Sequence, residues 1–149
     1  MILNGDEYYM RKAIDEALAA YEADEVPVGA VVVSKGKIIS RSHNLCERLV
    51  DATAHAEMQA ITAACNHLGS KYLNDCTLYV TLEPCMMCAG ALYWSQIGKV
   101  VYGAADPKRG FSSSGKQFIH PKTEIVGGVL SDECGELVSR FFREKRNRP

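Results

Sequence analysis

Apolar positions at helical spacing mark both ends of the chain. In residues 6–21 they recur every three or four positions with charged residues between them, and Pro27 follows shortly afterwards. This spacing predicts an amphipathic helix that ends before the proline. Residues 131–146 have the same spacing and predict a last helix. We expect four apolar residues of this helix to face the protein interior: Leu137, Val138, Phe141 and Phe142.

Short runs rich in Val, Ile and Tyr lie between these two segments and predict strands. The first two runs are joined by the turn Ser-Lys-Gly-Lys, in which Gly36 supplies the turn conformation, so we expect a β-hairpin. The predicted strands cover residues 28–33, 37–40, 77–83, 99–105 and, as a short last strand, 123–130.

Two more helices are predicted between the strands. One runs from residue 54 to about residue 67, with Thr53 as its N-cap and Gly69 at its end. The other runs over residues 85–96. Pro84 falls at its first position, where the missing proline N–H is tolerated.

The order of the elements is helix, strand, strand, helix, strand, helix, strand, short strand, helix. Residues 106–121 are rich in Gly, Ser and Pro and predict a long loop before the last strand. Such an order predicts an α/β protein, a three-layer α/β/α domain with a mixed central sheet. The chain has 149 residues without an internal repeat or a linker, so we expect one domain over residues 1–149.

Composition and charge say little about the fold but limit where the protein works. The apolar fraction of 47% is ordinary for a globular protein, and no apolar run is long enough to span a membrane. The first residues are acidic and unlike a signal peptide, so we expect a cytoplasmic protein without a membrane partner. The net charge is −1, but basic residues gather at the C-terminal end. This asymmetry permits a nucleic-acid partner, and it equally suits the end of a helix.

The six cysteines are more informative through their spacing than through their even number, because nothing indicates export. Cys85 and Cys88 form a CxxC at a predicted helix start, and His55 stands at the start of another helix. The other four cysteines are isolated in apolar contexts and are predicted to be buried free thiols: Cys46, Cys65, Cys76 and Cys134. The remaining histidines are not part of a comparable motif and are expected to be surface or core residues: His43, His67 and His120.

Cysteines three apart on a helix share one face, so Cys85 and Cys88 can reach a single ion. With His55 as a third ligand, tetrahedral zinc keeps one position for water, which is the pattern of catalytic rather than structural zinc sites. Both helix N-termini favour thiolates there, and zinc can lower the pKa of its water to about 7. The sequence therefore predicts one catalytic zinc per chain.

Glu57, two positions after His55, is predicted to carry protons rather than to bind the metal. Residues two positions apart on a regular helix point in different directions. His55 and Glu57 can therefore serve one pocket only if that pocket lies beyond the first turn of the helix. A carboxylate there can take a proton from water and return it to a base and a leaving amine, as hydrolytic deamination requires. Alone, the CxxC also fits a redox pair or half of a structural zinc site, but no second CxxC is present.

Together these residues form the H-x-E … P-C-x-x-C pattern of the zinc nucleobase deaminases. Nearly the whole chain resembles the bacterial tRNA adenosine deaminases, including TAHAEMQAI, TLYVTLEPCMMCAGAL and the D-x-K-x-G that begins at Asp106. The resemblance implies a cytidine-deaminase-like fold and a homodimer that converts the wobble adenosine of a tRNA anticodon loop into inosine. It also implies that His55, Cys85 and Cys88 bind zinc, that Glu57 is the proton shuttle and that Asn44 hydrogen-bonds the flipped base.

Two departures from this family accompany the resemblance: Ala52 stands where the family often has proline, and the 106–121 loop is shorter than in many relatives. Parts of the chain also resemble guanine and cytosine deaminases that act on free bases, which gives a second interpretation. A zinc-stabilised RNA-binding module without catalysis is a third, but such a module needs no Glu57.

The loop over residues 106–121 has few large apolar residues that could close a lid over a free base, which favours an RNA substrate. We expect basic residues outside the pocket to meet the phosphates of the tRNA anticodon arm. The candidates are Lys108 and Arg109 in the loop, and Arg143, Lys145 and Arg146 in the last helix.

Overall fold

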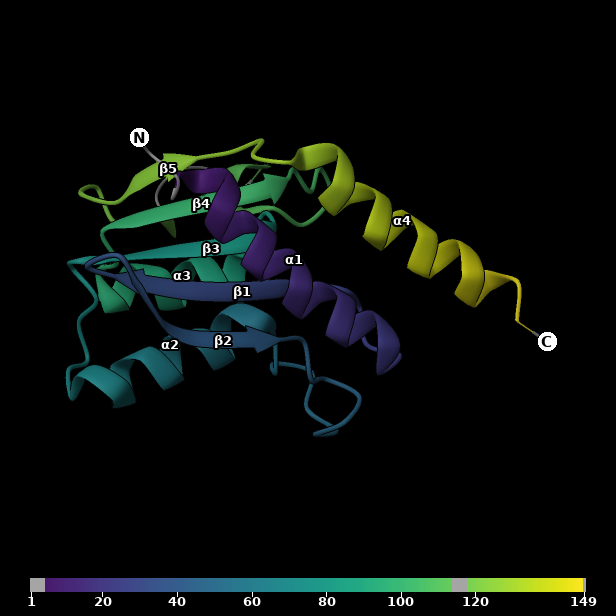
Figure 1. Cartoon of the computed structure of the whole chain (residues 1–149), viewed down its shortest axis with the longest axis horizontal. Coiled ribbons are helices and arrows are strands. Elements are labelled where there is room, and N and C mark those ends of the chain that lie inside the picture. Colours follow the sequence, from purple (N-terminus) through teal and green to yellow (C-terminus); the bar gives the residue numbers. More distant parts are fainter. Residues whose placement is uncertain (1–4, 114–117, 149) are drawn as a thin grey trace.

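The computed structural model describes residues 5–113 and 118–148, which fold around a five-stranded sheet (Figure 1). The helices of this part are α1 (Asp6–Glu22), α2 (Ala56–Leu68), α3 (Met86–Ser95) and α4 (Ser131–Arg146). The strands are β1 (Gly29–Ser34), β2 (Lys37–His43), β3 (Cys76–Leu82), β4 (Lys99–Ala104) and β5 (Glu124–Val126). The predicted order of elements is thereby confirmed, and residues 111–113 add a 3-10 turn to the 106–121 loop.

The sheet is mixed, with the strands in the order β2-β1-β3-β4-β5. β1 is antiparallel to β2 and β3, whereas β3, β4 and β5 are parallel. The predicted hairpin joins β1 to β2, and its turn residues Lys35 and Gly36 both have positive φ, at 51° and 76°. Two-residue turns of this kind match the twist of the strands that they join.

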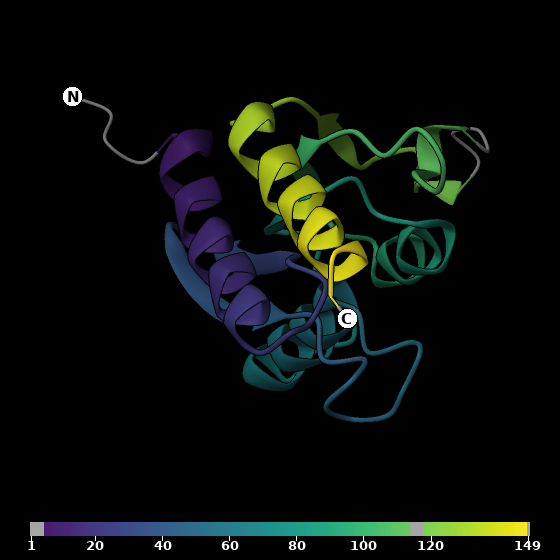
Figure 2. The ribbon, with the colours of Figure 1, turned by 90° about the vertical axis from the view of Figure 1, so that its right-hand side faces the viewer.

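Helices cover both faces of the sheet (Figures 1 and 2). One face packs against α2 and α3, and Ala30 and Val32 of β1 point into that core. The other packs against α1 and α4, and Val31 and Val33 point into it. Alternate side chains of a strand face opposite sides, so a strand buried on both sides is a continuous apolar run. This arrangement is the predicted three-layer α/β/α architecture.

The start of α2 differs from the prediction. The helix begins at Ala56, and His55, in extended conformation, is the N-cap. Thr53 therefore lies two positions before the cap, in a turn where its N–H and its hydroxyl both donate to the Asp51 carboxylate, each at 2.8 Å. The predicted end is correct, since Gly69 adopts the left-handed conformation at φ 64°.

The start of α3 also differs. Cys85 is its N-cap, so Pro84 lies just before the helix and not in its first turn. The helix ends at Ser95, where Gln96 turns left-handed and its N–H reaches the carbonyl groups of Leu92 and Tyr93.

α4 buries Leu137 and Phe141 as predicted and half-buries Val138, but Phe142 is 40% exposed. Phe141 packs edge-on against Tyr21 of α1, with ring centroids 5.7 Å apart. Phe142 is rotated about a quarter turn further round the helix and faces away. In the described part of the chain, no helix has both the length and the apolar character needed to cross a membrane.

Candidate metal centre and active site

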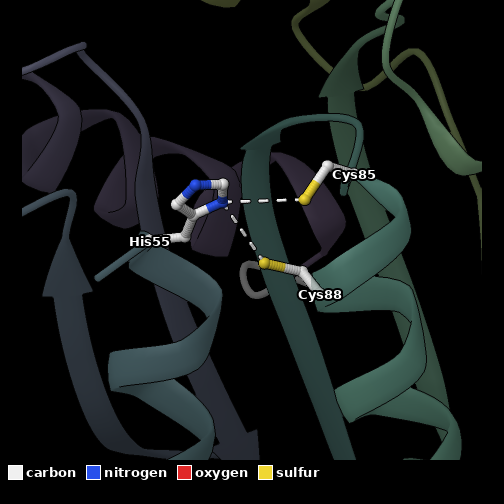
Figure 3. Close-up of side chains that lie close together, drawn as sticks. All are labelled: His55, Cys85 and Cys88. Carbon is white, nitrogen blue, oxygen red and sulfur yellow. Dashed lines mark hydrogen bonds between the residues drawn. The ribbon is translucent and has the colours of Figure 1, made fainter. Parts of the chain in front are cut away.

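His55, Cys85 and Cys88 meet where the first turns of α2 and α3 lie side by side (Figure 3). The Nδ1 atom of His55 lies 3.6 Å from Sγ of Cys85 and 3.5 Å from Sγ of Cys88. All ligand atoms of the three residues lie within 4.8 Å of one another. His55 and Cys85 are the N-caps of α2 and α3, and Cys88 follows one turn into α3. The structure therefore brings together the three residues that the sequence predicted as ligands.

The spacing of these atoms fits zinc. With Zn–S bonds of about 2.3 Å and Zn–N bonds of about 2.0–2.1 Å, a tetrahedral ion separates a nitrogen and a sulfur ligand by about 3.6 Å. Both nitrogen–sulfur distances agree with this value. One nitrogen and two sulfurs leave the fourth position of a tetrahedron to a non-protein ligand, as catalytic zinc sites do.

The protonation of the two cysteines is uneven in the metal-free protein. The pKa of Cys85 is lowered to about 4, mainly because the Cys88 thiol donates a hydrogen bond to its sulfur and also through His55. The pKa of Cys88 is raised, because its thiol gives that hydrogen bond and because it is buried. The pKa of His55 is raised, chiefly by its hydrogen bond with Cys85. One thiolate is thus already present to receive a cation.

Glu57 is buried, with 4% of its surface exposed, in the first turn of α2. Burial raises its pKa to about 7, against the lowering effects of its own backbone, of His55 and of Cys88. A carboxyl group with a pKa near neutrality can both accept and return a proton at physiological pH. His55, as N-cap, lies outside the regular helix, which is why two residues only two positions apart can serve the same site.

The predicted substrate-binding residues lie in three other segments. Asn44 follows β2, is 8% exposed and accepts the Cys46 N–H at its Oδ1 atom, over 3.3 Å. Lys108 is exposed in the loop after β4, two positions before Gly110, which forms a β-bridge with Cys85. Arg143 is exposed on α4, with its guanidinium 3.0 Å from Glu136. The binding of a substrate by these three residues remains a prediction, as do the roles of all the site residues.

The other cysteines and histidines take no part in this cluster. All six cysteines are free; Cys76 and Cys134 are buried, as expected, whereas Cys46 and Cys65 are only half-buried. His67 is exposed, and His43 and His120 are half-buried beside Glu16 and Tyr93.

Two buried carboxylates were not predicted from the sequence. Glu83 is 3% exposed and accepts the N–H groups of Asp106 and Ser112 at 2.9 and 3.0 Å. Glu25 is 1% exposed and accepts the N–H groups of Glu47 and Arg48 at 3.0 and 2.8 Å. Glu83 therefore ties the loop after β4 to the end of β3, and Glu25 ties the loop after β2 to the connection between α1 and β1. The one signal in the sequence is an acid placed directly against a Pro-containing apolar stretch, as in LEP and EVP.

Comparison with known proteins agrees with this site. The profile of the cytidine and deoxycytidylate deaminase zinc-binding region matches residues 3–104. The matched residues contain the whole ligand set, so fold and site define a zinc-dependent deaminase, a hydrolase by class. The chain belongs to the cytidine and deoxycytidylate deaminase family, in the branch of the bacterial tRNA-specific adenosine deaminases.

Three relatives place the chain within this family. The tRNA-specific adenosine deaminase of Bacillus subtilis is 52% identical over 149 residues, which cover 96% of this chain and 92% of that protein. A solved tRNA:A34 deaminase, which edits A to I at the wobble position of transfer RNA, is 44% identical, with a TM-score of 0.82 over 87% of this chain and 98% of that one. The guanine deaminase of Bacillus subtilis is 38% identical, with a TM-score of 0.67 over 75% of this chain and 71% of that one.

Proposed function

We propose that the protein hydrolyses adenosine to inosine at the wobble position of a tRNA anticodon loop, with one zinc ion held by His55, Cys85 and Cys88. The observation that carries this proposal is the pair of nitrogen–sulfur distances, 3.6 and 3.5 Å, beside a buried glutamate. The choice of substrate is supported by the 52% identity to a tRNA-specific adenosine deaminase over nearly the full length. We assign the activity to one domain, residues 1–149, acting in the cytoplasm where tRNA is modified.

The reaction adds water to C6 of the adenine ring and releases ammonia. Glu57 takes a proton from the attacking water and passes it to N1 of the ring as the new C6–O bond forms. The same carboxyl carries the second proton of that water to the exocyclic nitrogen, the C6–N bond breaks, and ammonia leaves. Zinc, when bound, supplies the Lewis acidity that makes water nucleophilic at neutral pH.

Asn44 is proposed to bind the base that enters the site. Its Oδ1 atom already accepts the Cys46 N–H, so the amide nitrogen is the group left to donate to a ring nitrogen of adenine. A base in an unpaired anticodon loop needs little unstacking energy to enter such a pocket. Lys108 and Arg143 are proposed to contact phosphates of the anticodon arm, and both are exposed.

We further propose a homodimer with α3 at its interface. Trp94 is 77% exposed and Met86 is 50% exposed, although both lie on a largely apolar helix. Apolar side chains gathered on one exposed element are typical of protein–protein contacts. Light scattering at micromolar concentration tests this, and we expect twice the mass of the chain. A Trp94→Glu variant is expected to be monomeric, and a parent of monomer mass contradicts the dimer.

Incubation of the zinc-loaded protein with an anticodon stem-loop that carries adenosine at the wobble position tests the proposed reaction. We expect inosine in the RNA and one ammonia per inosine, and neither product with Glu57→Ala. The 38% identity to a guanine deaminase supports a second candidate, the deamination of a free base. Ammonia released from guanine or cytosine, with the RNA left unchanged, would overturn the proposal in favour of that candidate.

A further inference from the structure

Glu25 is a fully buried carboxylate that the chemistry described above does not use. It stands three positions beyond the end of α1, and its N–H donates to the Ala20 carbonyl at 2.9 Å. With 1% of its surface exposed, it is among the most deeply buried large side chains of the described part. Burying a carboxylate is unfavourable unless its oxygens receive hydrogen bonds, so its partners indicate its role.

Both oxygens of Glu25 are bonded to one short turn of a loop. Oε1 accepts the Glu47 N–H at 3.0 Å, and Oε2 accepts the Arg48 N–H at 2.8 Å. These amides belong to a single helical turn, in which the Leu49 N–H bonds back to the Leu45 carbonyl at 2.9 Å. The first N–H groups of a helical turn have no partner within the turn, and a carboxylate is well suited to receive them.

The third free amide of the same turn is bonded to Asn44. The Cys46 N–H donates to the Asn44 Oδ1 atom at 3.3 Å. Three successive amides, at residues 46, 47 and 48, are thus divided between one oxygen of Asn44 and two oxygens of Glu25. The hydrogen bond to Cys46 directs the oxygen of the Asn44 amide toward the turn, and Glu25 leaves that oxygen to the Cys46 N–H by receiving the next two amides.

The turn lies in the loop that joins Asn44, proposed to bind the base, to His55, a predicted zinc ligand. The loop runs from β2 to α2 (Figure 1), so its first residue is Asn44 and its last is His55. Its two ends are bonded to each other through the Leu45 N–H and the Ala54 carbonyl, at 2.9 Å. A movement of the turn therefore also moves Asn44, the residue proposed to bind the base, because the Cys46 N–H of the turn is bonded to it.

We propose that Glu25 is a positioning residue of the deamination: its carboxylate holds the turn at residues 45–49 and thereby aims the Asn44 amide at the base. This inference rests on the proposed function, because the role of Asn44 belongs to it. Without the carboxylate, the amides of Glu47 and Arg48 compete for the Asn44 oxygen, and the amide group rotates away from the base.

Glu25→Gln tests this role with little change in size. The glutamine NH₂ group faces one of the two amides, which then lacks an acceptor. Leaving one buried donor unpaired is expected to lower kcat/KM for the anticodon stem-loop about tenfold or more. The zinc content should stay at one per chain. Glu22→Gln is the matched control, since Glu22 is an exposed acid at the end of α1, three positions before Glu25. Parent-like kcat/KM in Glu25→Gln, or an equal loss in Glu22→Gln, contradicts the proposal.

A double-mutant cycle separates positioning from general destabilisation. If Glu25 acts through Asn44, adding Glu25→Gln to Asn44→Ala should not lower kcat/KM further, because the group being aimed is already gone. If the two losses multiply instead, Glu25 acts by another route and the proposal is wrong.

Hydrogen exchange tests the hydrogen bonds between Glu25 and the turn without any enzyme assay. In the parent protein the amides of Glu47 and Arg48 should be protected, and Glu25→Gln should reduce this protection about tenfold or more, unlike Glu22→Gln. Unprotected amides in the parent overturn the role of Glu25, and this measurement needs no folded variant. A parent that leaves the RNA unchanged contradicts the proposed function instead, so the two failures are distinguishable.

Discussion

The Nδ1 atom of His55 lies 3.5 Å from the Sγ atom of Cys88, although 33 positions separate these residues in the chain. The contact joins the beginnings of α2 and α3, which cover the same face of the sheet. Both helix N-termini contribute partial positive charge at this point, which favours anionic sulfur. An ion held here ties two elements together, so metal binding and the stability of the fold are coupled.

Loss of a ligand should therefore remove both zinc and stability. We expect His55→Ala and Cys88→Ala to be isolated with far less than one zinc per chain and to unfold at lower temperature than the parent. Metal analysis and thermal unfolding measure this. The absorption spectrum of the cobalt-substituted parent should indicate one nitrogen and two sulfur ligands. Cys65→Ala, a half-buried cysteine outside the cluster, is the control and should keep its zinc.

Zinc affinity should rise with pH. In the metal-free protein the lowered pKa of Cys85, about 4, leaves a thiolate, whereas the raised pKa values of Cys88 and His55 favour their protonated forms. Zinc needs both thiolates and a neutral imidazole, so its binding releases protons, and acid opposes it. Calorimetric titration in two buffers of different ionisation enthalpy should give at least about one proton released per zinc at neutral pH. Heats that are the same in both buffers contradict this.

Glu57→Gln should abolish turnover without loss of the metal. The amide has the size of the carboxyl but cannot carry protons between water, ring and leaving amine. General acid–base catalysis of this kind contributes about 10²–10⁴-fold, and we expect a loss of that order in kcat. Zinc content and unfolding temperature should stay close to those of the parent. Turnover near the parent rate would assign proton transfer to another group.

The three layers of the fold could be predicted from the spacing of apolar residues, because a strand buried on both faces is a continuous apolar run. The β1 run alternates between two cores, with Val31 facing α1 and Val32 facing α2, and both positions are apolar. The metal ligands could also be predicted from the sequence, since zinc chemistry restricts the type and the spacing of the residues that bind the ion. Both features are repeated patterns or fixed spacings, which one sequence is enough to reveal.

Hydrogen bonds made by individual side chains have no such repeated pattern or fixed spacing in the sequence. Thr53 is a good N-cap by residue type, but it lies in a turn closed by its hydrogen bonds to the Asp51 carboxylate, and the helix starts only at Ala56. Glu25 and Glu83 look like ordinary exposed acids, yet they are buried because N–H groups more than 20 positions away bind them. Such partners become evident only once the chain is folded.

Val50→Gly should stabilise the protein. Val50 has φ 50°, a left-handed conformation that is unfavourable for a β-branched residue, and its side chain is 91% exposed. Glycine removes the strain and gives up almost no packing, so we expect a gain of about 1 kcal/mol, partly offset by the greater freedom of glycine in the unfolded chain. This corresponds to a rise in Tm of about 2–4 °C. Val50→Ala relieves less strain and should fall between the two. A lower Tm for the glycine variant contradicts this account.

The final prediction concerns the basic end of α4. Figure 1 places this end on the side of the molecule where β3 ends and α2 and α3 begin. Arg143 is paired with Glu136 and Lys145 lies over the Phe141 ring, 5.6 Å from its centroid. Exposed pairs of this kind contribute little energy, so phosphates can replace them.

Changing Arg143, Lys145 and Arg146 to Gln should therefore weaken binding of the anticodon stem-loop and flatten its salt dependence. The log–log slope should fall by about one unit for each phosphate that is no longer neutralised. Zinc content should not change. The control changes three other exposed lysines to Gln: Lys35 and Lys37 at the β1–β2 hairpin, and Lys71 after α2. This variant should leave the slope as it is. Binding measured from low to high salt gives both slopes. If the α4 variant binds and deaminates the RNA like the parent, these residues serve only the helix end, and the phosphates meet another surface.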